Sequence, residues 1–274
     1  MISTAEPSVI ILGSGTCVPS LKRSAASALI LLDGVRFLVD AGPGTMWRLL
    51  ETGTTIFDIS FILLTHFHPD HTGELASFLF ATKYPDPAQR QTPLTIVAGK
   101  GFSDFFGKLK NVYGSWIELA PGLLNLKEMD SHGPDVCRVK GVTVESMPMR
   151  HRDESIAYRL TGPDGLSIVY SGDTDYCENL VILAENADLL ICESALPDAM
   201  KVEGHLTPSL AGDIASRAHV RQLVLTHFYP ECDHVDLVHE CRKTYTGPLV
   251  IAQDLMKIRI PAPFPGGVES FVPV

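Results

Sequence analysis

The sequence has no apolar run that approaches the ~18 residues of a membrane-spanning helix. Residues 1–7 also lack the basic start and the long apolar core of a secretory signal peptide. These absences exclude a protein embedded in a membrane by helices. They predict a soluble, cytoplasmic protein with no membrane partner.

Cysteine is present but not grouped. The six cysteines are scattered along the chain and form no Cys-x-x-Cys pair. Small secreted domains that depend on disulfides carry denser cysteine patterns. The spacing therefore favours reduced, mostly buried thiols in a reducing compartment.

Basic segments are also missing. The formal net charge is −10, and the sequence contains no block of lysine and arginine. A protein that binds a long polyanion normally presents a basic surface. The composition therefore argues against specific tRNA binding and leaves a small anionic ester as the expected partner.

The length and composition predict a folded protein with a real core. The chain has 274 residues, of which 45% are hydrophobic, and it shows no internal repeat or low-complexity tract. We therefore interpret residues 1–274 as one domain. Within it, residues 261–274 are expected to form an extended arm because of their prolines, Pro261, Pro263, Pro265 and Pro273.

The most informative segment is residues 65–71, Thr-His-Phe-His-Pro-Asp-His, which follows an apolar run. If a strand ends here and a helix follows, His66 and His68 can point the same way at one metal ion. Asp70 and His71 can then turn toward a second ion. The alternative is a surface loop with incidental histidines, which is disfavoured because three of the 10 histidines lie here beside an aspartate.

The pattern His-x-His-x-Asp-His resembles the signature of the metallo-β-lactamase superfamily of hydrolases. The resemblance implies three further metal ligands, in a set order and each just after a strand. Apolar runs at residues 142–147, 166–172 and 222–226 are followed by suitable residues. These residues are His151, Asp173 and His227.

The resemblance also implies how the ligands divide between two divalent ions, with zinc as the first choice and manganese as the second. The first ion would be held by His66, His68 and His151, and the second by Asp70, His71 and His227. Asp173 would bridge them, because a carboxylate offers an oxygen to each ion whereas a histidine cannot offer one nitrogen to both. Asp40 matches the buried orienting carboxylate of the family. Residues 13–16 and 40–45 resemble family turns whose glycines let the backbone pass beneath the metals.

Apolar runs and helical periodicity alternate along the chain. Strands are expected at residues 9–12, 28–32, 35–39, 59–64, 94–98, 142–147, 166–172, 188–192 and 222–226, and helices at 46–51, 71–82, 102–109, 177–184 and 207–218. Asp33-Gly34 predicts a hairpin, and Pro208 marks Thr207 as a helix N-cap. The two successive β-then-α sets are consistent with the α/β fold that the resemblance implies, an αββα sandwich of two mixed sheets flanked by helices.

Further segments resemble the branch of this superfamily that contains ribonuclease Z and small phosphodiesterases. They are residues 157–160, Ala-Tyr-Arg-Leu, residues 170–174, Tyr-Ser-Gly-Asp-Thr, and residues 204–207, Gly-His-Leu-Thr. In that branch a His-x-Thr segment before a helix supplies a histidine that stands beside the scissile phosphate without binding metal. The resemblance assigns this role to His205 and assigns the acidic residue that orients it to Glu193.

One family feature is missing. In ribonuclease Z a long arm that grasps tRNA is inserted between the third histidine ligand and the bridging aspartate. Here Asp173 follows His151 by only 22 residues, a gap filled by one hairpin that turns at residues 162–165. The shortness of this gap and the acidic charge both argue against tRNA as the substrate.

The resulting expectation is a phosphodiesterase that acts on a small phosphodiester or a cyclic phosphate. Two ions would generate hydroxide and neutralise the phosphoryl oxygens, Asp70 would accept the proton of the nucleophile, and His205 would donate to the substrate. A tRNA 3′-end endonuclease, an aryl sulfate or lactone hydrolase, and a metal-holding protein without turnover remain open as alternatives. The aromatic residues Phe102, Phe105 and Phe106 favour core packing or a homodimer contact over a platform for the substrate.

Overall fold

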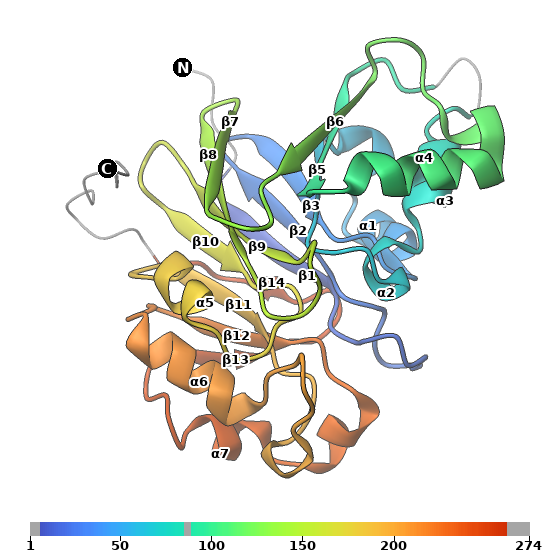
Figure 1. The fold of residues 1–274 in the computed structure, drawn as a ribbon. Coiled ribbons are helices and arrows are strands. Elements are labelled where there is room, and N and C mark those ends of the chain that lie inside the picture. The colour runs from blue at the N-terminus through green and yellow to red at the C-terminus, as the bar shows by residue number, and fades with distance from the viewer. Residues whose placement is uncertain (1–5, 85–88, 262–274) are drawn as a thin grey trace.

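The computed structural model describes residues 6–84 and 89–261, and Figure 1 shows two β-sheets packed face to face with helices on their outer faces. Each sheet has seven strands among these residues. This arrangement confirms the predicted αββα sandwich. The predicted arm lies almost wholly outside the described residues, because only residue 261 of it is included.

The first sheet comes from the N-terminal half of the chain and one late strand, in the order β14-β1-β2-β3-β4-β5-β6. Its strands are β1 (Ser8–Gly13), β2 (Ser27–Leu32), β3 (Val35–Val39), β4 (Phe61–Leu64), β5 (Leu94–Gly99), β6 (Leu124–Met129) and β14 (Lys257–Ile258). The β1, β2 and β3 strands run antiparallel, whereas β3 to β6 are parallel. The predicted hairpin between β2 and β3 is confirmed, and Asp33 and Gly34 take positive φ values of 49° and 72° there.

The second sheet has the order β13-β12-β11-β10-β9-β8-β7. Its strands are β7 (Asp135–Val139), β8 (Val142–Pro148), β9 (Ile156–Thr161), β10 (Ser167–Tyr170), β11 (Leu189–Glu193), β12 (Leu223–Thr226) and β13 (Leu249–Ile251). The β7 to β10 strands are antiparallel, and β10 to β13 are parallel. Because parallel strands end at the same edge of a sheet, the segments that follow β10, β11 and β12 emerge together.

Helices cover both outer faces (Figure 1). Those beside the first sheet are α1 (Thr45–Glu51), α2 (Pro69–Thr72), α3 (Leu75–Ala81) and α4 (Phe102–Tyr113), and those beside the second are α5 (Glu178–Leu183), α6 (Pro208–Arg217) and α7 (Leu237–Cys241). Short 3₁₀ turns occur at η1 (Ile56–Asp58), η2 (Gly114–Ile117), η3 (Asp198–Met200) and η4 (Pro230–His234). None of the described helices is long and apolar enough to cross a membrane. All six cysteines are free thiols, and all but Cys17 are at least partly buried, as predicted.

The prediction of one continuous helix over residues 71–82 is wrong, because the chain turns at Glu74 between α2 and α3. The N–H of Glu74 donates to the carbonyl of Ala41 at 2.9 Å. Its carboxylate accepts from the N–H groups of Gly44 and Met46, each at 2.7 Å. The Glu74 carboxylate therefore accepts hydrogen bonds from backbone N–H groups at the start of α1. These bonds and the bond to Ala41 hold the turn before α1 against the segment that contains the metal-binding motif.

Thr207 occupies the N-cap position of α6, as predicted, and Pro208 occupies its first turn. The Thr207 backbone is extended, with φ of −123°, but its side chain makes no capping hydrogen bond. The proline alone therefore supplies the local start signal, because its fixed φ suits the first helical position.

The inner faces of the two sheets share one hydrophobic core. Tyr158 of β9 is fully buried, and its hydroxyl donates to the carbonyls of Leu64 at 2.8 Å and Val97 at 3.1 Å. This contact ties the second sheet to the end of β4, the strand that carries the metal-binding motif. Between the first sheet and its helices, Phe102 and Phe106 are buried in a second core, so core packing is confirmed for these two rings.

Candidate metal centre

Seven polar side chains meet at the edge where parallel strands of both sheets end. They come from the loop after β4, the turn between β8 and β9, and the segments after β10 and β12. In chain order they are His66, His68, Asp70, His71, His151, Asp173 and His227. The structure thus brings together all seven residues that the sequence predicts as metal ligands.

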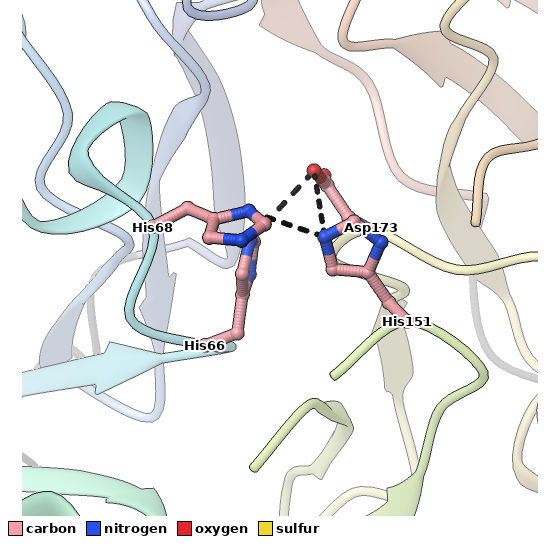
Figure 2. Close-up of side chains that lie close together, drawn as sticks. All are labelled: His66, His68, His151 and Asp173. Carbon is pink, nitrogen blue, oxygen red and sulfur yellow. Dashed lines mark hydrogen bonds and ion pairs between the residues drawn. The ribbon is translucent and has the colours of Figure 1, made fainter. Parts of the chain in front are cut away.

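The first set consists of His66, His68, His151 and Asp173, whose ligand atoms all lie within 4.8 Å of one another. Figure 2 shows the imidazoles of His66 and His68 facing those of His151 and the Asp173 carboxylate across a common space. Asp173 Oδ2 lies 3.8 Å from His66 Nε2 and 3.9 Å from His151 Nε2, and His151 Nε2 lies 3.2 Å from His68 Nδ1. Such separations suit a small divalent ion, whose bonds to these atoms are about 2.0–2.2 Å long.

The second set consists of Asp70, His71 and His227, again within 4.8 Å of one another. Asp70 Oδ2 lies 3.8 Å from His71 Nε2 and 3.7 Å from His227 Nε2. All three residues are buried. Two imidazole nitrogens and one carboxylate oxygen therefore converge away from bulk water.

Asp173 stands between the two sets. Its Oδ2 faces the first set, whereas its Oδ1 lies 3.3 Å from His71 Nε2 and 3.2 Å from His227 Nε2. Burial alone would raise the pKa of Asp173, but the imidazoles of His227 and His71 outweigh it and hold the pKa well below its ordinary value. One ionised carboxylate therefore presents a separate oxygen to each histidine set.

The chemistry of these groups fits divalent metal ions. Several of the buried atoms in the centre have no hydrogen-bond partner among the described residues, namely His66 Nε2, His71 Nε2, Asp173 Oδ1 and His227 Nε2. Leaving a buried polar atom unpaired costs about 1–3 kcal/mol. Imidazole and carboxylate donors together accept zinc or manganese, which would satisfy these atoms at once.

Asp40, the carboxylate expected to orient the site, lies fully buried beneath it. Its Oδ2 accepts from His71 Nδ1 at 2.8 Å, and its carboxylate accepts from the Thr65 hydroxyl at 3.0 Å. The Thr65 hydroxyl oxygen in turn lies 3.1 Å from His66 Nδ1. With the Nδ1–H of each ring directed at these oxygens, the Nε2 atoms of His66 and His71 are left for the metal. Burial raises the pKa of Asp40.

The backbone at this edge is strained and tightly packed. Asp40 and His227 have φ values of 58° and 62°, in the left-handed region that residues other than glycine rarely adopt. At Gly42, an added Cβ would lie 1.9 Å from the carbonyl oxygen of Asp70. Glycine at position 42 therefore lets the turn after β3 pass directly beneath the loop that carries the ligands.

His205 lies beside both sets, next to Glu193 at the end of β11. Its Nδ1 is 3.0 Å from Glu193 Oε1, and Glu193 also accepts from the N–H groups of Thr174, Leu206 and Ala195. Burial alone would lower the pKa of His205, but the hydrogen bond and charge of Glu193 raise it to about 9.

His205 Nδ1 is also within 3.9 Å of Asp173 Oδ2, so it lies within reach of the metal-binding atoms. Because Nδ1 is directed at Glu193, Nε2 is the ring nitrogen left for another group. The side chain is 14% exposed, whereas that of Glu193 is 1% exposed. The geometry thus presents an oriented, protonated imidazole at the rim of the centre.

Comparison with known proteins identifies the family. A family model described as the β-lactamase superfamily domain matches residues 35–228, well over half of the chain. This chain belongs to the metallo-β-lactamase superfamily. It is 30% identical to a ribonuclease Z from Salinispora arenicola, an alignment that covers 95% of this chain and 97% of that protein.

Solved structures of superfamily members are similar over nearly their full length. The metallo-β-lactamase fold protein YhfI from Bacillus subtilis has a TM-score of 0.77 at 22% identity, covering 92% of this chain and 98% of that one. The short form of human tRNase Z has a TM-score of 0.75 at 25% identity, covering 93% and 100%. These similarities agree with the observed fold.

Two contributors to the metal centre were not recognised from the sequence. Thr65 links Asp40 to His66, and its position directly before the first histidine is a signal that could have indicated it. Gly204 accepts a hydrogen bond from His151 Nδ1 at 3.0 Å through its carbonyl oxygen. Any residue has a carbonyl oxygen, so no residue type could have signalled this contact.

Proposed function

We propose that this superfamily hydrolase is a dinuclear metal-dependent phosphodiesterase that acts on a small phosphodiester or a cyclic phosphate. The observation that carries the proposal is the placement of Asp173 between two histidine sets, with the oriented imidazole of His205 beside both. Two cation positions and one proton donor are the groups that in-line hydrolysis of a phosphodiester requires.

The metal ions would be held as the two sets suggest, with Asp173 shared. When bound, they would supply the Lewis acidity that makes water nucleophilic at neutral pH and that neutralises phosphoryl oxygens. The donor set accepts zinc, which is our first choice, or manganese. Asp40 and Thr65 keep the ring nitrogens of the ligands in the orientation that this requires.

The protein's own groups would handle the protons. Asp70 Oδ2 lies at the second set, where it would accept the proton of the attacking water. His205, with a pKa of about 9, carries a proton at neutral pH and would donate it, or a hydrogen bond, to the phosphate or the leaving oxygen. Glu193 would orient His205, because its remaining hydrogen bonds to backbone N–H groups fix its carboxylate.

A small substrate is favoured over tRNA by what lies between His151 and Asp173. That segment contains β9, β10 and the turn between them, and it carries no long insertion. The alignment with the Salinispora ribonuclease Z is 315 positions long, whereas this chain contributes 95% of its 274 residues to it, which is about 260. At about 55 positions the relative therefore has a residue and this chain has none. With a net charge of −10, specific tRNA binding is not expected.

The second candidate is a tRNA 3′-end endonuclease, which the names of the Salinispora relative and the human structure favour. Hydrolysis of an aryl sulfate or a lactone is a further alternative, because the same centre would polarise those esters.

The cytoplasmic location of the protein and its assembly into a homodimer stay predictions.

Parallel assays of the zinc-loaded protein separate these functions. They should use bis(p-nitrophenyl) phosphate, an aryl sulfate, a lactone and a precursor tRNA. We expect the phosphodiester to be hydrolysed with the highest kcat/KM. Faster, site-specific cleavage of the precursor tRNA would instead establish the endonuclease, and preference for the sulfate or lactone would overturn phosphodiester chemistry.

A further inference from the structure

The segment after β10 contacts more than the metal site. Directly after Asp173, the N–H of Thr174 donates to Glu193 Oε1 at 2.8 Å, and its hydroxyl accepts from the N–H of Arg150 at 3.1 Å. The N–H of Asp175 donates to the carbonyl of Arg150 at 2.8 Å. Three consecutive residues therefore connect the bridging position, the loop of His151 and the carboxylate that orients His205.

The side chain of Asp175 extends this connection to the loop that carries His205. Its Oδ2 accepts from the N–H of Gly204 at 2.9 Å and from Lys201 Nζ at 3.1 Å. Its Oδ1 lies 3.0 Å from Lys201 Nζ and accepts from the N–H of Tyr176 at 2.7 Å. The carboxylate is 11% exposed, so these charge-assisted bonds form largely out of water, where they are strongest.

Gly204 is the residue through which Asp175 reaches both functional histidines. Its N–H is held by Asp175, its carbonyl accepts from His151 Nδ1 at 3.0 Å, and it directly precedes His205. Its φ is +85°, and an added Cβ would lie 3.1 Å from His151 Nδ1. The position therefore favours glycine for both its conformation and its space.

From these contacts we propose that Asp175 is a positioning residue, which sets the orientation of His151 and the placement of His205 together by holding Gly204. The role of His205 in this proposal rests on the proposed function, whereas the link to His151 concerns metal binding alone. Without Asp175, the Gly204 N–H and the Lys201 ammonium lose their shared acceptor. The carbonyl that orients His151 and the backbone before His205 are then released at the same time.

The test compares Asp175→Ala and Asp175→Asn with the unaltered protein, each in full length and loaded with zinc. Loss of the hydrogen-bond partner of a metal ligand, here the Gly204 carbonyl that Asp175 holds, typically costs about 10–100-fold in metal affinity or activity. We expect Asp175→Ala to weaken one of two zinc-binding steps by about that factor. At saturating zinc, its kcat on a phosphodiester should still be lower, with little change in KM. Asp175→Asn should recover part of both losses, because the amide oxygen can still accept from Gly204.

Asp188→Asn is the matched control. Asp188 also binds a backbone N–H, that of Ser167 at 2.9 Å, and an arginine, Arg221 at 3.0 Å. It directly precedes β11, at the end of that strand opposite Glu193. The control should lower the melting temperature while leaving zinc affinity and kcat unchanged, which separates positioning from general destabilisation.

The outcomes discriminate among the parts of the proposal. Unchanged zinc affinity in Asp175→Ala, or equal losses in Asp188→Asn, would overturn the link to His151. Weaker zinc binding with full kcat at saturating zinc would overturn the link to His205. If the unaltered protein hydrolyses no phosphodiester, the proposed function and the His205 link both fail, and the zinc titration still decides the His151 link.

Discussion

Replacing His205 with alanine removes an imidazole that lies near Asp173 and His227 and that our prediction assigns to turnover instead of metal binding. Its Nδ1 is 3.0 Å from Glu193 Oε1. Because the hydrogen bond and charge of Glu193 raise its pKa to about 9, we expect the ring to carry its second proton at pH 7. The His205→Ala variant should therefore lose a charged donor at the rim of the centre.

The expected magnitude follows from the role of a positioned acid, which contributes about 10²–10⁴-fold in rate. This corresponds to about 2.7–5.5 kcal/mol of activation free energy. Glu193 keeps its backbone donors from Thr174, Leu206 and Ala195 in the variant. The free energy of unfolding should therefore fall by no more than about 1–3 kcal/mol, and both metals should remain bound.

The assay measures kcat at saturating zinc for two phosphodiesters, one with a p-nitrophenolate leaving group and one with an alkoxide leaving group. If His205 protonates the leaving oxygen, the loss should shrink for p-nitrophenolate, which needs no proton. If His205 stabilises charge on the phosphoryl group, the loss should be similar for both. Metal content and melting temperature are measured on the same samples.

The pH dependence supplies an independent check. A histidine whose pKa is raised by folding is fully protonated below its unfolded value of 6.5 and loses the proton as the pH rises through about 9. Turnover by the unaltered protein should therefore decline above about pH 9, and the variant should lack this decline. Near-normal turnover of every phosphodiester by His205→Ala would refute the reasoning and leave the two metals as the only catalysts.

Four further predictions follow from the structure. Glu193→Gln should lower kcat by about 10-fold, less than His205→Ala does. The decline of turnover at alkaline pH should move to lower pH, because the Glu193 carboxylate no longer raises the pKa of His205, and a decline still centred near pH 9 would contradict this. Elemental analysis should find close to two transition-metal ions per chain, with Asp173→Ala weakening both positions and His66→Ala chiefly one; trace metal that does not increase on adding zinc or manganese would rule out the dinuclear centre. Precursor tRNA should bind only nonspecifically, with Kd of about 10⁻⁴–10⁻⁶ M at physiological salt, and tight binding in a filter or fluorescence titration would promote the endonuclease. Tyr158→Phe should lower the free energy of unfolding by about 1–3 kcal/mol, because the Leu64 and Val97 carbonyls lose a donor, and an unchanged denaturation midpoint would show that these contacts contribute nothing.

Features that depend on neighbouring residues were predictable from the sequence. The hairpin at Asp33-Gly34 follows from two residues that tolerate positive φ, and the strands before the ligands follow from short apolar runs. The spacing of residues 66–71 predicted that His66 and His68 point to one metal ion and that Asp70 and His71 point to another. Side chains alternate in direction along any extended segment, so this prediction needs no knowledge of distant residues. Local geometry thus determined the type of most elements and indicated the ligands within residues 66–71, whereas His151, Asp173 and His227 were indicated by the resemblance to the superfamily.

Features that depend on distant parts of the chain were decided only by the tertiary structure. The helix expected over residues 71–82 is interrupted because the backbone N–H of Glu74 donates to the carbonyl of Ala41, more than 30 residues earlier in the chain, and not to a carbonyl within the helix. The two oxygens of Asp173 face different histidine sets because four separate strand ends meet at one edge. Gly204 orients His151 through a carbonyl group, which every residue possesses, so only the packing of the two loops could reveal its role.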